Sequence, residues 1–66
     1  MMDLLTVPDC VGRWVAVSTL TGVVEGLLEG YLLSADGELR SVQVRVIDLG
    51  VLYVPSTSIG WLRVVT

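Results

Sequence analysis

The sequence predicts an all-β fold: a small, five-stranded, strongly bent barrel preceded by a short N-terminal helical turn. From residue 13 onward, short runs of β-branched and aromatic residues alternate with glycine-containing turns, and no stretch is long enough for a second, longer helix. Near the end of the chain an apolar run stops at Pro55, three hydroxyl residues follow, and an apolar run restarts at Ile59. Several short strands joined by tight turns are typical of a barrel.

Length and composition indicate a self-associating protein. The 66 residues suffice for one domain, covering residues 1–66. A chain this short buries only about 60% of its unfolded surface, yet 53% of its residues are hydrophobic. Cys10 is the single cysteine, so no intrachain disulfide forms, and the sequence contains no histidine and no metal-ligand cluster. Burial between subunits is the simplest way to hide the apolar surplus, so we expect a homo-oligomer.

The helical turn is expected within residues 1–12, where Asp3 would cap a first turn and Pro8 suits the first position of a second one. Gly12 ends this segment. The first strand is expected over residues 13–20. Both of its faces are largely apolar, which is typical of a strand that is covered on both sides.

The second strand is expected over residues 23–34. Gly26 and Gly30 lie inside it, and their spacing places them on one face of a regular strand. Paired glycines mark a bulge or a sharp bend, which would let one strand serve both halves of a tiny barrel. Residues 34–38 form a hairpin loop around Asp36 and Gly37. The remaining strands are expected over residues 39–48, 51–54 and 59–65, the first of them with Val42, Val44 and Val46 inward.

Two motifs can be read along the chain, one before and one after the predicted hairpin loop at residues 34–38. In the first, a glycine precedes a V-x-V strand, and a turn glycine, G-x-L and an aromatic follow. Its residues are Gly12, Val15, Val17, Gly22, Gly26, Leu28 and Tyr31. The second motif consists of Val54, Pro55, Ser56, Thr57, Ser58 and Ile59. With these two motifs the chain resembles the Sm-like superfamily of small β-barrels, the second motif matching in length. The resemblance covers about residues 12–64 and implies a ring of five to seven copies.

The chain departs from the family pattern where typical members hold uridine-rich RNA. Leu32 stands where the family has aspartate, and Pro55 and Ser56 replace an Arg-Gly pair. The net charge is −3, with four arginines and no lysine, which does not favour binding to a phosphate backbone. The resemblance therefore implies the barrel and the ring more strongly than it implies RNA binding.

Our leading hypothesis is a non-catalytic interaction module whose fourth strand pairs with the fifth strand of a neighbour. The subunit interface would contain Val51, Tyr53, Val54, Ile59, Trp61 and Leu62. Apolar edge strands invite such pairing, and a ring removes both edges. Because the sequence holds no histidine, and no other acid–base or nucleophile constellation, we expect no enzyme activity and no cofactor.

Two alternatives stay open. One is an RNA-binding ring that uses the hydroxyl loop Ser56, Thr57 and Ser58, although such hydroxyls commonly satisfy the backbone of their own turn. Its RNA contacts would be Arg13, Arg45, Arg63 and Tyr31. The other is a monomeric SH3-type adaptor that binds a protein through an aromatic groove formed by Tyr31 with Glu25 and Glu29.

A cytoplasmic location without a membrane segment is expected. The longest uncharged stretch, residues 49–62, is interrupted by Pro55 and is shorter than the about 20 residues of a spanning helix. The N-terminus also lacks the basic region of a signal peptide.

Overall fold

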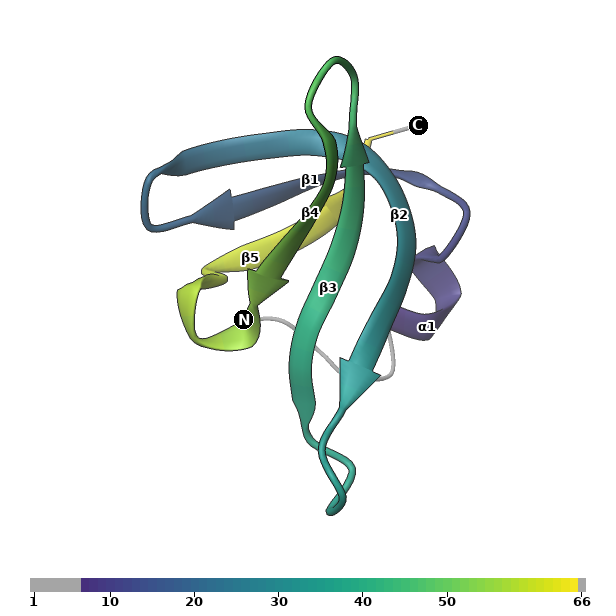
Figure 1. The fold of residues 1–66 in the computed structure, drawn as a ribbon, viewed down its shortest axis with the longest axis vertical. Coiled ribbons are helices and arrows are strands. Elements are labelled where there is room, and N and C mark those ends of the chain that lie inside the picture. The colour runs from purple at the N-terminus through teal and green to yellow at the C-terminus, as the bar shows by residue number, and fades with distance from the viewer. Residues whose placement is uncertain (1–6, 66) are drawn as a thin grey trace.

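Five antiparallel strands form one bent, open sheet in the order β4-β3-β2-β1-β5 (Figure 1). The computed structural model describes residues 7–65. Its elements are α1 (Val7–Cys10), β1 (Trp14–Thr19), β2 (Gly22–Leu33), β3 (Leu39–Val46), β4 (Gly50–Pro55), the 3-10 turn η1 (Ser56–Ser58) and β5 (Trp61–Val64). The predicted fold class, a five-stranded and strongly bent all-β fold with a short N-terminal helical turn, is confirmed. The expected cap at Asp3 lies outside the described residues.

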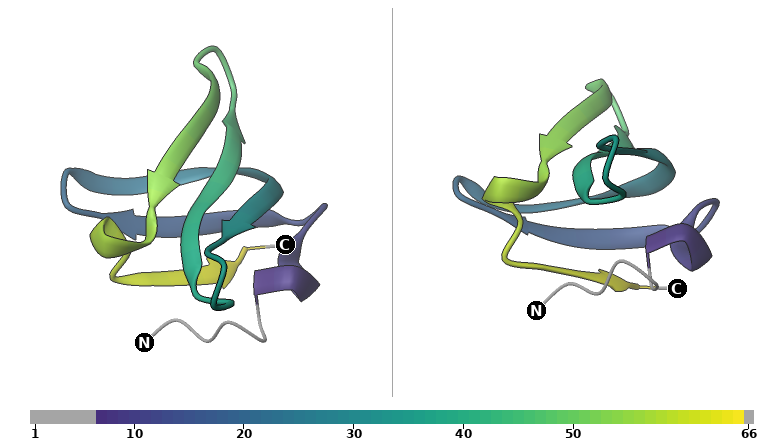
Figure 2. Two further views of the ribbon diagram at one scale, coloured as in Figure 1. Left: turned by 60° about the horizontal axis from the view of Figure 1, so that its bottom comes forward. Right: turned by 90° about the horizontal axis from the view of Figure 1, so that it is seen from below.

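The long strand β2 connects the two halves of the sheet. Its first half pairs with β1, from Gly22 to Leu27, and its second half pairs with β3, from Leu27 to Leu33. The register shifts between Leu28 and Gly30, which marks a β-bulge. Figure 2 shows the result: β1 and β5 lie side by side in one layer, and β3 and β4 cross over it. The predicted bend near Gly26 and Gly30 is therefore present.

The bulge corrects one detail of that prediction. Gly26 pairs with Val15 on the inner face, whereas Gly30 pairs with Gln43 on the outer face. The two glycines thus lie on opposite faces, because the extra residue of the bulge reverses the alternation that the sequence spacing implies.

Turn residues set the ends of the other strands. Asp48 has φ 72° and Gly50 has φ 83°, so β3 ends at Val46 rather than at the predicted residue 48. Around Gly37, at φ 87°, the hairpin between β2 and β3 closes as predicted, and the Ser34 hydroxyl donates to Asp36 and lowers the pKa of that carboxyl. Pro55 continues β4 opposite Ser41, one residue beyond the predicted end, which an edge strand tolerates.

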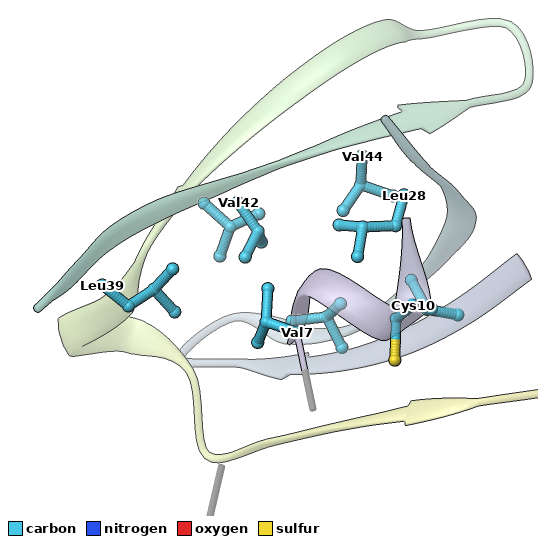
Figure 3. Close-up of a cluster of buried hydrophobic side chains, with 9 residues drawn as sticks. Val7, Cys10, Leu28, Leu39, Val42 and Val44 are labelled. Atoms are coloured by element: carbon cyan, nitrogen blue, oxygen red, sulfur yellow. The ribbon is translucent and has the colours of Figure 1, made fainter. Parts of the chain in front are cut away.

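The core lies between the two layers and is closed by α1. Its buried side chains are Val7, Cys10, Val15, Val17, Leu28, Leu39, Val42, Val44 and Val54. Figure 3 shows Val7 and Cys10 of α1 in the same cluster of buried side chains as Leu28, Val42 and Val44. The predicted inward positions on β3 are confirmed, with Val42 and Val44 fully buried and Val46 packed against them.

Among residues 7–65, no helix is long and apolar enough to cross a membrane.

Candidate functional site

The two edge strands of the open sheet form the candidate site. Among residues 7–65, β4 pairs on one side with β3 and β5 pairs on one side with β1, so within this part of the chain each of the two strands has one unpaired side. Residues 56–60, which include η1, separate the two strands along the chain. Unpaired backbone N–H and C=O groups on an edge are available to another strand.

Side chains of β4 alternate between the core and solvent. Val54 is only 5% exposed and belongs to the core, and Leu52 packs against that core. Tyr53, between them, is 70% exposed on the outer face, opposite Gln43 of β3. Of the predicted interface residues on this strand, Tyr53 and the half-buried Val51 therefore present outward side chains, whereas Val54 would contribute only its backbone.

Side chains of β5 and of the segment before it also alternate between the core and the outer face. Ile59 and Leu62 are half-buried and pack against the core. Trp61 lies on the outer face, where the guanidinium of Arg63 sits 4.8 Å from the centre of its ring. This cation–π contact holds Arg63 along the strand. The outward side chains of the two edges are thus aromatic or apolar, apart from Arg63.

The hydroxyl loop, residues 56–58, forms hydrogen bonds with the backbone of its own turn. The Ser58 hydroxyl donates to the Pro55 carbonyl at 2.9 Å, and the Ile59 amide donates to the Ser56 carbonyl at 3.1 Å. The Gly60 amide then donates to the Ser18 carbonyl of β1 at 2.9 Å. Thr57 is exposed at the tip. Within this subunit the loop is a local turn, anchored to β1, with one exposed hydroxyl residue.

The four residues expected to contact RNA occupy different parts of the fold. Arg13 follows α1, and Arg63 covers Trp61 on β5. Arg45 of β3 is hydrogen-bonded to the Glu29 carboxylate, which raises the pKa of its guanidinium, and its Nη2 lies 3.3 Å from Glu29 Oε1. Tyr31 pairs with Val42 on the inner face and packs against the core.

The residues of the expected adaptor groove are also apart. Glu25 lies opposite Ala16 on the outer face of β1 and β2. Glu29 is the extra residue of the bulge and forms a salt bridge with Arg45. Tyr31 is half-buried on the inner face. Neither a pocket nor a cluster of three metal-ligating side chains occurs within the described part of the chain.

A further surface carries apolar side chains of which only Trp61 was assigned as a site residue from the sequence. It is the outer face of β2, β1 and β5, and its apolar residues are Trp14, Ala16, Val23, Leu27, Trp61 and Val65. The signal for it was present in the first strand, whose two faces are both apolar.

Comparison with known proteins found no matching family model, no matching curated protein and no matching solved structure.

Proposed function

We propose that this chain is a non-catalytic, Sm-like structural module that assembles head to tail into a homo-oligomeric ring of five to seven copies. The observation that carries the proposal is the open sheet, whose two free edges, β4 and β5, end the strand order β4-β3-β2-β1-β5. Pairing β4 of one copy with β5 of the next satisfies both edges of every subunit. Such an interface is heterologous, and it closes into a ring when the rotation between copies allows.

The outward side chains of the two edges support this pairing. In a sheet continued across the seam, Tyr53 of one copy would lie on the same face as Trp61 and Arg63 of the next. Tyr53 is 70% exposed in the single subunit, and contact with a neighbouring aromatic ring would bury it.

Tyr53→Asp is the variant that tests the seam. A charge such as Leu62→Asp would also reach the core, because Leu62 packs against it. Tyr53 touches solvent instead, so Tyr53→Asp leaves the subunit folded and places a charge on the edge, which opposes strand addition. Leu20→Asp is the matched control, since Leu20 is 86% exposed in the turn between β1 and β2.

Native mass spectrometry of the untagged protein reads out the result. We expect assemblies built from rings of five to seven copies for the wild type and for Leu20→Asp, and loss of the ring in Tyr53→Asp. A wild type without ring-sized species, or a Tyr53→Asp variant with an unchanged assembly, would contradict the proposal. Additional mass from nucleic acid in the ring would support the RNA-binding alternative.

A further inference from the structure

The outer face of β2, β1 and β5 is apolar although it faces solvent. Its centre is Ala16 of β1, which is only 2% exposed because its neighbours surround it. The flanking positions hold Trp14 and Leu27 at one end and Val23 and Trp61 at the other. Val23 keeps 58% of its surface exposed.

Strand β3, in the other half of the sheet, shows what an outward row of residues in water looks like in this chain. The apolar residues on the outer face of that half come from its neighbours β2 and β4, namely Leu32, Val51 and Tyr53. The outward residues of β3 are Ser41, Gln43 and Arg45, all polar, as expected for a sheet with one face in water. The outward residues of β1 are Trp14, Ala16 and Ser18. The two faces of β1 therefore have the composition of a strand covered on both sides, whereas the core covers only one of them.

Two opposite charges frame this apolar surface. Glu25 of β2 and Arg63 of β5 are both register partners of Ala16, so they flank it in a single row across the three strands. Neither forms a salt bridge with another of residues 7–65. Across the three strands the row therefore contains an acidic residue on β2, a small residue on β1 and a basic residue on β5.

We propose that a second copy of this chain covers this face, in a two-fold symmetric pair whose axis runs close to the direction of β1. A rotation about that axis exchanges the β2 side with the β5 side. Glu25 of each copy then lies opposite Arg63 of the other, and the two Ala16 residues meet near the axis. An axis across the strands would instead bring Glu25 onto Glu25, so the charges select the first orientation.

The same rotation also matches the apolar residues. Val23 of one copy meets Trp61 of the other, and Leu27 meets Val65. Sheets that pack face to face lie about 10 Å apart with strands within about 30° of each other. Glutamate and arginine side chains are long enough to span that gap together. The pair would bury the apolar surface around Ala16, which the core of the subunit does not cover.

This inference does not rest on the ring. The ring joins the backbone edges of β4 and β5, with Tyr53 beside Trp61 and Arg63 at the seam, whereas the pair buries the whole outer face around Ala16. Both can form in one assembly, and either can fail alone. Tyr53→Asp separates them, because it blocks the edge and lies outside the face.

Charge reversal in the Tyr53→Asp background tests the pair. The single changes Glu25→Arg and Arg63→Glu each put two like-charge contacts into a homodimer, so we expect each to raise the dimer dissociation constant at least about tenfold. An equal mixture of the two variants restores both opposite-charge contacts between different chains. The mixture should therefore form a heterodimer as tight as the parental homodimer, with a one-to-one composition by native mass spectrometry.

The mixing step excludes a role within one subunit, since no change inside one chain is repaired by adding another. Glu38→Arg and Arg40→Glu, at the start of β3 and outside the face, are the matched controls and should leave the dissociation constant unchanged. Circular dichroism checks that each variant is folded. The proposal would be overturned if the Tyr53→Asp protein stayed monomeric at 100 times the lowest concentration that the assay detects. It would also be overturned if the mixture of the two charge variants did not associate.

Discussion

At the scale of single residues, Gly26 is the glycine at which an added Cβ atom would have the closest contacts. A Cβ atom there would collide with the backbone carbonyl of Arg45 and would lie 2.8 Å from Cγ1 of Val44. The cause is the close approach of β3 to β2 where β2 leaves its pairing with β1. Gly30, four residues later, is different. A Cβ atom added there would lie 3.2 Å from Oε1 of Gln43, at the end of a flexible side chain.

We therefore predict that Gly26→Ala destabilises the protein by about 3 kcal/mol or more, at or beyond the upper end of overpacking costs. Gly30→Ala should cost less than about 1 kcal/mol, because the Gln43 side chain can move aside. A domain of this size has roughly 3–10 kcal/mol of stability in total, so Gly26→Ala should lose between about a third and all of it. Denaturant midpoints of the two variants at equal protein concentration test this, and equal midpoints would disprove the close approach.

The sequence predicted that both glycines mark a bend, but it did not distinguish their roles. Spacing alone places Gly26 and Gly30 on one face, and only the bulge between Leu28 and Gly30 separates them. A bulge arises from the joint geometry of three strands, so a pattern read along one strand does not contain it.

At the scale of elements, α1 is a four-residue helix that is held by its contacts with the core. Val7 is fully buried and Cys10 is 2% exposed, whereas Pro8 and Asp9 face solvent. A helix this short has no stability of its own. Its two buried side chains close the core beside Leu28 and Val44 (Figure 3).

Cys10→Ser should lower the free energy of unfolding by about 1–3 kcal/mol, because it buries a hydroxyl group in an apolar environment. Cys10→Ala removes the sulfur without adding a polar group, so it should be the more stable of the two variants. Asp9→Ala, on the exposed side of the same helix, should change stability by less than about 0.5 kcal/mol. If the serine variant matched the alanine variant in a denaturant titration, Cys10 would not be in the core.

Strand positions were predictable to within one or two residues, because each strand carries its own alternation and each turn its own glycine. The ends that differ depend on local conformations that alternation does not show. Asp48 adopts a positive φ and ends β3 early. Before β5 begins, the Ile59 amide donates to Ser56 of η1 and the Gly60 amide donates to Ser18 of β1. The residues predicted for the subunit interface lie on or next to the two edge strands, and among them Val54 faces the core.

The two faces of β1 show that residue alternation is also limited in what it predicts about the candidate site. The sequence indicates a strand that is covered twice, and one cover is found within the subunit. Alternation shows that a face is apolar, but it does not show which neighbour covers it. The charges of Glu25 and Arg63 become informative only once the register places them on both sides of Ala16.

At the scale of the whole molecule, the single subunit leaves large apolar side chains in solvent. Within residues 7–65 those at least half exposed are Leu20, Val23, Leu32, Ile47, Leu49 and Tyr53. Leu20 lies in the turn between β1 and β2, and Ile47 and Leu49 lie in the turn between β3 and β4. Val23 lies on the outer face of β1 and β2, Leu32 lies opposite Ser41 of β3, and Tyr53 lies on the β4 edge. A small domain with a limited core gains stability when such surface is buried by other copies.

Thermal stability should therefore increase with protein concentration. For a six-membered ring, a tenfold rise in concentration adds about 1.2 kcal/mol per subunit, and for a dimer about 0.7 kcal/mol, because association favours the folded state by mass action. In a domain of this size these energies raise Tm by about 5–10 °C and about 3–6 °C. The wild type should follow the larger dependence and Tyr53→Asp the smaller one. Adding Glu25→Arg to Tyr53→Asp weakens the remaining contact at least about tenfold, so the double variant should need at least about ten times more protein than Tyr53→Asp to reach the same Tm. Calorimetry of the three proteins across a hundredfold concentration range measures these dependences. A wild-type Tm that is independent of concentration would rule out both modes of assembly. A double variant whose Tm rises with concentration and equals that of Tyr53→Asp throughout would mean that copies associate through a surface other than the β4 edge and the Ala16 face.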